Sequence, residues 1–429
     1  MSRQLIRALF LTHVDPAHFE SRGSGIQQRF ELLLDGLARV TEHIDFVIMV
    51  AGADTASSAA REAAAAAFLS DRAQRPVSVR LVPLAREEAE RGPWQRYVLA
   101  ARSLDTLPGY RAYVGNAQLE AVASVLRQHR YDGLMVQRLC CAAIVLRLQQ
   151  RLALPPVLFD LDDIEHVAYR RLVAQPPHWR SKPLAYLQLP ALMRGERRAL
   201  RLARASFVCA ENDRRKLERL YRARNLEVIP NAVVPPLAPL PPAHAPTLLF
   251  VGIYGHAPNR AAAEFFLDHV WPRIRARVPT ARVVFAGARP EAVTHYAAPP
   301  QGVSFTGFVA DLQPLYAAAR VVVCPLLSGG GTRMKIIEAA AYARPVVATR
   351  IGAEGLVFTD GEEILIRDAA AAFAAACITL LEDHAACTRM GLAARARVDA
   401  HYRRDSVAAH LASCILARLR IPPEHVGTA

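Results

Sequence analysis

The chain lacks the features that mark membrane-spanning, secreted and disulfide-bonded proteins. Only 7 of its 429 residues are cysteine, and their scattered positions match neither a disulfide framework nor the spacing of a zinc site. The alanine-rich runs at 59–67 and 369–376 are broken by charges or too short to span a bilayer. The N-terminus has no signal-peptide hydrophobic region or cleavage site. We therefore expect a cytoplasmic protein with reduced cysteines in its core and no metal site.

Several motifs of common enzyme classes are also missing. The sequence contains no Gly-x-x-x-x-Gly-Lys-Ser/Thr phosphate loop, no Gly-x-Ser-x-Gly nucleophile turn and no His-Glu-x-x-His zinc motif. The segment Gly252-Ile253-Tyr254-Gly255 lacks the spacing of the dinucleotide-binding fingerprint. These absences exclude the simplest assignments to nucleotide triphosphatases, serine hydrolases, zinc proteases and dinucleotide-dependent enzymes.

Acidic residues are too few to balance the basic ones. The 53 lysines and arginines exceed the 39 acidic residues, and the net charge of +14 predicts an anionic partner. Part of this excess is concentrated at 194–224, where Tyr221 is the single aromatic residue among the basic ones, so a base-stacking surface for nucleic acid is not expected. Two interpretations of this segment stay open: a solvated helix face, or a surface that docks on an anionic membrane.

What the chain does have is a long alternation of apolar strands and helical patterns. Its length predicts two or more domains, and its 52% hydrophobic content supplies a large core. Strand–helix alternation is typical of parallel sheets covered on both faces. In the first half, strands are expected at 5–12, 44–50, 77–84, 133–136, 156–160, 205–210 and 226–229, with helices at 26–39, 117–128, 139–152 and 211–222.

Proline then interrupts the alternation. The prolines between Pro230 and Pro246 exclude helix and central strand, so this segment is predicted to be a semi-rigid linker. Beyond it the alternation restarts, with a strand at 247–252 and a helix at 260–275. We predict an N-terminal domain at 1–230, a linker at 231–246, a C-terminal domain at 247–400 and a last helical segment at 401–429. The fold class is α/β, with two doubly wound lobes and a cleft between them.

The segment 325–354 is the most informative of the chain. An apolar strand, Val321–Cys324, leads into the loop Ser328-Gly329-Gly330-Gly331-Thr332, and a helix is expected from about Arg333. Free N–H groups and the positive end of the helix dipole would hold an anion there, together with Arg333 and Lys335. Glu338, about one turn later, is placed to accept hydrogen bonds from sugar hydroxyls. The pattern predicts a phosphate and ribose site; the open alternative is an ordinary turn in which the glycines serve only the backbone.

Motifs along the second half resemble the nucleotide-sugar-binding lobe of GT-B glycosyltransferases, specifically the retaining family 4. The matching segments are Val251-Gly252 with Pro258-Asn259, the strand and turn Val303–Val309, the loop and helix Ser328–Ala341, and the strand and loop 345–356. The hinge Val228-Ile229-Pro230-Asn231 is also similar. The resemblance implies two Rossmann-like domains and a UDP- or GDP-type sugar donor, with no metal or other cofactor. The donor-binding residues it indicates, together with the neighbouring cation Arg260, are Gly252, Asn259, Arg260, Phe308, Val309, Gly329, Gly330, Gly331, Thr332 and Glu338.

One departure from that family concerns the donor sugar. Members carry two glutamates around the signature loop; the second corresponds to Glu338, whereas the first falls on Gly330. The Gly-Gly-Gly-Thr-Arg-Met-Lys form resembles a variant branch of the family. The carboxylate that would hold donor-sugar hydroxyls is therefore missing.

Sugar transfer requires the departing diphosphate to be stabilised, and without a metal this falls to cations and helix N-termini. Arg333 and Lys335 are the predicted catalytic cations. If the family's retaining stereochemistry holds, the departing phosphate itself takes the acceptor proton. An acceptor that is a glycan or is linked to a lipid is expected, at the inner face of a membrane.

The N-terminal half contributes a cluster of carboxylates at the end of a predicted strand. Asp160 and Asp162 are candidates for catalysis or acceptor binding, and Asp163 and His166 are weaker ones. A divalent-metal site or helix capping are the alternatives for this cluster. The loop residues Gly23, Ser24 and Gly25 form a second candidate acceptor or phosphate loop.

These observations predict an enzyme, a glycosyltransferase of polysaccharide or glycolipid synthesis. Two other functions stay open: an epimerase of the same fold acting on a nucleotide sugar, and a non-catalytic nucleotide- or sugar-binding protein.

Overall fold

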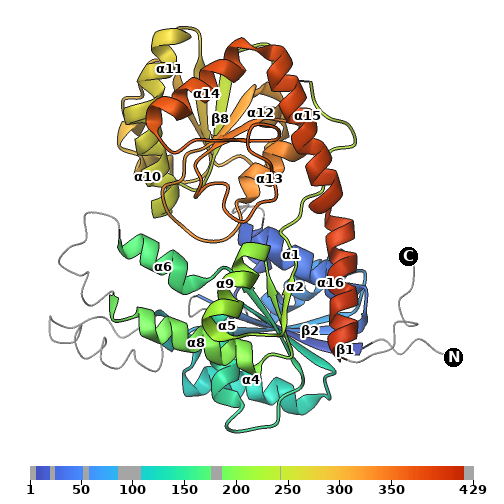
Figure 1. The fold of residues 1–429 in the computed structure, drawn as a ribbon. Coiled ribbons are helices and arrows are strands. Elements are labelled where there is room, and N and C mark those ends of the chain that lie inside the picture. The colour runs from blue at the N-terminus through green and yellow to red at the C-terminus, as the bar shows by residue number, and fades with distance from the viewer. Residues whose placement is uncertain are drawn as a thin grey trace. The chain divides into compact units, whose positions relative to one another are not determined.

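The computed structural model describes residues 6–19, 25–51, 58–85, 108–174, 186–241 and 243–419 (Figure 1). These residues form two compact units. The first contains residues 6–19, 26–229 and 407–419, and the second contains residue 25 and residues 230–406.

The first unit is built on a seven-stranded sheet with the strand order β3-β2-β1-β4-β5-β6-β7. Every neighbouring pair of strands is parallel. The strands are β1 (Ile6–Thr12), β2 (Thr41–Val50), β3 (Val77–Pro83), β4 (Gly133–Gln137), β5 (Val157–Asp162), β6 (Ala205–Val208) and β7 (Leu226–Val228). Leu9, Phe10 and Leu11 of β1 are fully buried, as expected for a central strand covered on both faces.

Helices connect these strands. They are α1 (Gly25–Ala38), α2 (Ser58–Ala73), α4 (Asn116–Gln128), α5 (Arg138–Leu148), α6 (Glu165–Val173), α8 (Leu189–Leu202) and α9 (Glu211–Tyr221), with short 3₁₀ turns at η1 (Pro16–His18) and η3 (Pro108–Tyr113). The strand order reverses direction between β1 and β4, because β2 and β3 lie on one side and β5 to β7 on the other. This position is the topological switch point of the sheet, where parallel α/β folds bind ligands.

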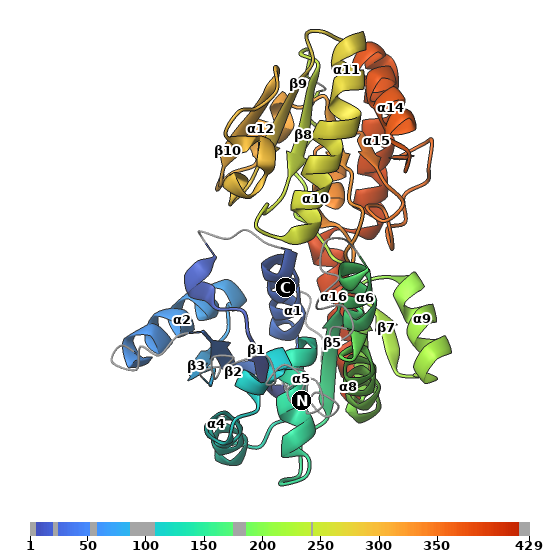
Figure 2. The same cartoon turned by 90° about the vertical axis from the view of Figure 1, so that its left-hand side faces the viewer.

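The second unit is built on a six-stranded parallel sheet with the order β10-β9-β8-β11-β12-β13. The strands are β8 (Thr247–Val251), β9 (Arg282–Ala286), β10 (Val303–Gly307), β11 (Val321–Cys324), β12 (Val346–Ala348) and β13 (Leu365–Ile366). The α-helices are α10 (Ala257–Phe265), α11 (Trp271–Arg277), α12 (Gln313–Ala318), α13 (Met334–Ala341), α14 (Ala370–Glu382) and α15 (His384–His401). Figure 2 shows α10 and α11 running beside β8. Here the switch point lies between β8 and β11.

The helix expected at 260–275 differs from the structure in its interior. It begins at Ala257 and contains a π-helical turn, η4 (Phe266–Val270), before continuing as α11. Pro272 lies in the first turn of α11 and has no N–H to donate to the preceding turn, so the backbone widens there.

The last helix, α16 (Arg404–Leu419), packs from residue 407 onward on the first unit. A Cβ atom placed on Gly36 of α1 would lie 2.4 Å from Cδ2 of Leu411, so glycine permits the close approach of the two helices. Nε of Arg418 donates to Glu227 at 3.0 Å.

The structure places the cysteines and the most apolar helices. All seven cysteines are free, and six of them are buried. Within the described residues, no single helix is long and apolar enough to cross a membrane; the helix pair α14 and α15 passes by length and composition but is bent by 104°. Phe373, Cys377 and Leu380 of α14 lie in the core of the second unit.

Candidate functional site

Two loops meet at the carboxyl edge of the second sheet. Strands β8 and β11 are neighbours, with Leu248 paired to Val321 and Leu249 to Val322. The loop after β8 begins at Gly252, and the loop after β11 contains the glycines Gly329, Gly330 and Gly331. The switch point of this sheet therefore brings together the two segments that the sequence singles out for donor binding.

The glycine loop contains two residues with positive φ angles. Gly329 has φ +112° and Gly331 has φ +67°, values that glycine adopts without strain. A Cβ atom on Gly329 would lie 3.0 Å from Nη2 of Arg333. Successive N–H groups in such a turn can point toward one anion, and the N-terminus of α13 adds its positive dipole end.

Arg333 lies at the junction of this loop and α13. The helix begins at Met334, and Arg333 is its N-cap residue in an extended conformation. Its Nη1 donates to the carbonyl oxygen of Gly330, so the guanidinium folds back over the glycine loop. The cation is thereby held beside the N–H groups that would bind a phosphate.

Lys335, in the first turn of α13, reaches across to α10, the helix that follows β8. Its Nζ donates to Oδ1 of Asn259 at 2.9 Å and lies 4.7 Å from the centre of the Phe250 ring. Burial lowers the pKa of Lys335 to about 8, and Arg333 contributes in the same direction, while Cys324 and Glu338 oppose the shift. An anionic ligand at this position would favour the protonated ammonium.

The loop after β8 holds Asn259 in place. Nδ2 of Asn259 donates to the carbonyl oxygen of Ile253 at 3.0 Å, and a Cβ atom on Gly252 would lie 3.1 Å from Cγ of Asn259. Gly252 thus provides the space in which the amide orients its oxygen toward Lys335. Arg260, the next residue, is exposed to solvent.

Glu338 is positioned by an aromatic pair. The hydroxyl of Tyr316 donates to Oε2 of Glu338 at 3.1 Å, and the Tyr316 ring stacks on Tyr342 at a centroid distance of 4.7 Å. Tyr316 is almost fully buried, whereas Glu338 keeps part of its surface exposed. The carboxylate is therefore held one turn beyond the glycine loop, with surface left for a ligand.

Phe308 and Val309 follow the edge strand β10 at the same end of the sheet. The Phe308 side chain is exposed (42%), which is unusual for a large aromatic residue. An exposed ring at this edge can stack on a planar group such as a nucleobase.

The structure adds two buried polar residues that were not among the predicted site residues. Nδ2 of Asn231 donates to Oγ1 of Thr332 at 2.8 Å, which ties the segment after β7 to the glycine loop. Within the described residues, Oδ1 of Asn231 and Oγ of Ser328 are buried and have no hydrogen-bond partner. Such atoms are available to the hydroxyl or phosphate groups of a ligand. Sequence similarity indicated Asn231 only as part of a hinge.

Asp160 lies near the end of β5, and its side chain forms a buried ion pair. Its carboxylate is fully buried, and Arg29 of α1 donates to it through Nε at 3.0 Å, while Nη1 of Arg29 donates to the carbonyl oxygen of Ile229 at 2.6 Å. We expected this carboxylate to face a ligand at the strand end. Instead it neutralises a buried arginine inside the first unit, because an unpaired guanidinium is costly to bury. The buried ion pair with Arg29 argues against a catalytic role for Asp160, which stays a prediction.

The other predicted residues of the first unit are Asp162, Asp163 and His166, which lie at the end of β5 and after it. Asp162 has φ +56°, and the Cys209 thiol lies 3.5 Å from its Oδ1. Asp163 follows it and is half-buried. Nδ1 of His166 lies 2.6 Å from Oε2 of Glu196, a buried carboxylate that also accepts from the Tyr221 hydroxyl at 2.8 Å. His166 is thus anchored between α6 and α8.

The candidate loop at residues 23–25 is described only at its end. Gly25 is the first residue of α1, while Gly23 and Ser24 lie outside the described residues.

Comparisons with known proteins agree with this architecture. Residues 245–383 match the family model described as glycosyl transferases group 1. A sequence comparison with curated proteins gave no match. The match lies within the second unit, and the chain is a glycosyltransferase.

Several solved structures are similar to this chain over almost its whole length. Sucrose-phosphate synthase from Thermosynechococcus elongatus has a TM-score of 0.69 at 18% identity, with 98% of this chain and 100% of that chain covered. HepE of Anabaena, solved with UDP-glucose, has a TM-score of 0.62 at 14% identity, with 96% and 100% covered. TarM has a TM-score of 0.65 at 10% identity, with 96% and 99% covered. The shared fold is GT-B, the architecture with two parallel-sheet α/β domains.

Proposed function

We propose that the protein transfers a sugar from a nucleoside diphosphate donor, of the UDP or GDP type, to a glycan or lipid-linked acceptor with retention of configuration. The observation that carries this proposal is the position of Lys335 and Arg333 beside the glycine loop at the switch point of the second sheet. HepE solved with UDP-glucose, and a TarM variant solved with UDP and α-GlcNAc-glycerol, support a nucleotide-sugar donor and a glycan-type acceptor.

The proposed chemistry assigns each group a separate task. The N–H groups of Gly329 to Thr332 and the cations Arg333 and Lys335 bind the diphosphate, and they gain most when negative charge accumulates on it as the sugar leaves. Glu338 binds the ribose hydroxyls. The departing phosphate accepts the proton of the acceptor hydroxyl, so no separate protein base and no metal are required.

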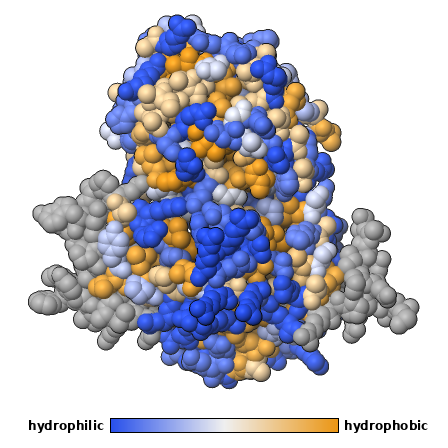
Figure 3. Space-filling view, in the orientation of Figure 1, coloured by the Kyte–Doolittle hydropathy of each residue, from blue (hydrophilic) through white to orange (hydrophobic). Residues whose placement is uncertain are grey.

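The proposed setting is polysaccharide or glycolipid synthesis at the cytoplasmic face of a membrane. Helix α8 supports this proposal because its apolar residues Leu192 and Leu200 are buried while its arginines are exposed. Figure 3 shows many hydrophilic residues, with hydrophobic ones among them, in the lower half of this face of the molecule. Arginines on a helix surface attract anionic headgroups.

A thermal-shift panel tests the donor site first. The purified chain is heated with UDP, GDP, ADP, their sugars and inorganic phosphate, and a specific nucleotide raises the unfolding midpoint by mass action. We expect one nucleoside diphosphate to raise the unfolding midpoint of the wild type. The control variant Glu291→Gln, which changes a surface carboxylate paired with Arg289, should show the same shift. The shift should vanish in Glu338→Ala. No shift with any nucleotide would contradict the proposal.

A second measurement separates a transferase from an epimerase and from a binding protein. Release of nucleoside diphosphate is followed with and without candidate glycan and lipid-linked acceptors. Release that requires an acceptor identifies transfer. A changed sugar configuration without release identifies an epimerase, and binding without either change identifies a non-catalytic protein.

A further inference from the structure

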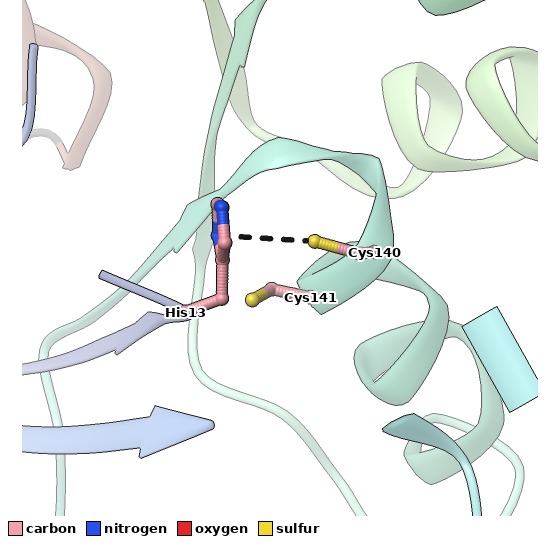
Figure 4. Close-up of side chains that lie close together, drawn as sticks. All are labelled: His13, Cys140 and Cys141. Carbon is pink, nitrogen blue, oxygen red and sulfur yellow. Dashed lines mark hydrogen bonds between the residues drawn. The ribbon is translucent and has the colours of Figure 1, made fainter. Parts of the chain in front are cut away.

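The switch point of the first sheet carries a cluster of sulfur and nitrogen ligands that the proposed sugar transfer does not use. His13 directly follows β1, and Cys140 and Cys141 lie in the first turn of α5, directly after β4. Because β1 and β4 are neighbouring parallel strands, their carboxyl ends place these three side chains together. Figure 4 shows both sulfur atoms beside the His13 side chain, with the contact between Cys140 and the imidazole drawn as a dashed line.

The distances are close to those of a metal site. One ligand atom from each of the three residues lies within 4.8 Å of the other two, and Sγ of Cys140 is 3.9 Å from Nδ1 of His13. In a tetrahedral zinc site, bonds of about 2.3 Å to sulfur and about 2.0 Å to nitrogen place neighbouring ligand atoms roughly 3.5 to 3.8 Å apart. Rotamer adjustments of less than about 1 Å would close the cluster around one ion.

The two cysteines of the cluster are less exposed than the histidine. Both sulfur-bearing residues are buried, whereas His13 is half-buried and provides a route from solvent.

A disulfide is the obvious alternative use of two neighbouring cysteines, and the backbone disfavours it. Consecutive Cα atoms are about 3.8 Å apart, whereas Cα atoms of disulfide-linked residues are usually about 4.4 to 6.8 Å apart. Cys140 and Cys141 also belong to a regular helical turn, which a bond between their sulfurs would distort. Metal coordination uses the same sulfurs without that distortion.

We propose that His13, Cys140 and Cys141 bind one thiophilic divalent cation of the zinc class. The imidazole coordinates through Nδ1 and the two sulfurs coordinate as thiolates, so binding releases two thiol protons to solvent. The site belongs to the first unit and is independent of the proposed donor site in the second unit.

Cobalt(II) titration tests this proposal on the full chain without nucleotide, after reduction and removal of metal with a chelator. Thiolate ligands give cobalt an intense charge-transfer absorption, which reports sulfur coordination directly. We expect saturation at one cobalt per chain, competition by zinc, and at least a ten-fold weaker affinity in Cys140→Ser, Cys141→Ser and His13→Gln. Circular dichroism verifies that each variant is folded.

The chain supplies its own control in Cys414. Cys414 of α16 is half-buried, and its Sγ lies 3.8 Å from Nε2 of His410. These two residues form a Cys–His pair that is separate from the proposed metal site. Cys414→Ser should leave the cobalt affinity unchanged. The proposal is overturned if no charge-transfer band forms, if the three ligand variants bind as the wild type does, or if the band is lost in Cys414→Ser. It is also overturned if mild oxidation yields a Cys140–Cys141 disulfide by mass spectrometry in a chain that binds no cobalt.

Discussion

The ammonium group of Lys335 donates a hydrogen bond to Oδ1 of Asn259, at 2.9 Å, and so joins the helices α13 and α10, whose preceding loops meet at the switch point of the second sheet. The two residues are far apart in sequence but lie on the helices that follow the neighbouring strands β11 and β8. An amide oxygen can hold the ammonium in place without neutralising it. The positive charge therefore stays available for an anionic ligand.

Replacing Lys335 by Met should weaken nucleoside diphosphate binding about 10- to 100-fold, because a charge-assisted hydrogen bond contributes about 1.5 to 3 kcal/mol. The turnover number should fall further if the ammonium also stabilises the departing diphosphate. Isothermal titration calorimetry and initial rates measure the two effects. Lys216→Met, on α9, is the matched control and should leave both unchanged. Equal binding by the two variants would exclude Lys335 from the donor site.

The lowered pKa of Lys335, about 8, predicts a pH dependence of nucleotide affinity. Affinity should be highest below pH 8, where the free ammonium is protonated, and should fall as the pH rises through that value. A bound diphosphate raises the pKa of Lys335, so binding near pH 8 takes up protons. Calorimetry in two buffers of different ionisation enthalpy detects this uptake. A profile as steep in Lys335→Met as in the wild type would assign the proton to another group.

The lowered pKa of Lys335 also predicts how the stability of the ligand-free protein depends on pH. Because the folded-state pKa of Lys335 lies below the ordinary value of 10.5, the unfolded chain binds more protons between about pH 8 and 10.5. The free energy of unfolding of the wild type should therefore rise with pH across this window relative to that of Lys335→Met. Urea unfolding at several pH values measures the difference.

Glu338 is predicted to recognise ribose hydroxyls rather than phosphate. The wild type should bind a ribonucleoside diphosphate more tightly than its 2′-deoxy analogue, and Glu338→Gln should lose most of this preference. Tyr316→Phe removes one hydrogen bond to the carboxylate and should cost only about 1 kcal/mol of affinity. Competition calorimetry with the two nucleotides gives the ratio. A preference that is unchanged in Glu338→Gln would place the ribose elsewhere.

Gly287 should be among the least replaceable residues of the second unit. It has φ +137°, and a Cβ atom there would lie 1.9 Å from the carbonyl oxygen of Gly252. We expect Gly287→Ala to lower the free energy of unfolding by at least about 3 kcal/mol. Gly361 also has a positive φ, +86°, but nothing lies within 4 Å of a Cβ atom there, so Gly361→Ala should cost only about 1 kcal/mol. Similar losses in both variants would show that backbone strain, rather than the clash, decides the effect.

Binding to anionic membranes is predicted to depend on α8. Changing the exposed Arg194, Arg197, Arg198 and Arg201 to Ser should weaken sedimentation with phosphatidylserine vesicles by about 1 kcal/mol per residue at low salt. Added salt should weaken wild-type binding in the same way. Uncharged phosphatidylcholine vesicles and an Arg273→Ser, Arg277→Ser double variant of the second unit are the controls. Vesicle binding that survives in the α8 variant would favour a solvated helix face.

The sequence by itself determined the strands and their order of occurrence. Apolar runs bounded by glycine, proline and charge predict β1 (Ile6–Thr12), β4 (Gly133–Gln137) and β11 (Val321–Cys324) within a residue of their observed bounds. The glycine loop and the cations beside it were also predictable, because a local run of residues encodes a strand, a turn and a helix start together. The likeness to glycosyltransferases followed from the same local motifs.

The tertiary structure alone decided which distant side chains meet. Asp160 follows the pattern of a strand-end carboxylate, yet Arg29 neutralises it inside the core. Asn231 meets Thr332, and His13 meets Cys140 and Cys141, through contacts that span more than 100 residues. Local propensity carries no information about such pairs, since they arise from the order in which parallel strands assemble into the sheet. That order places the ends of β1 and β4, and of β8 and β11, side by side, and both candidate sites lie there.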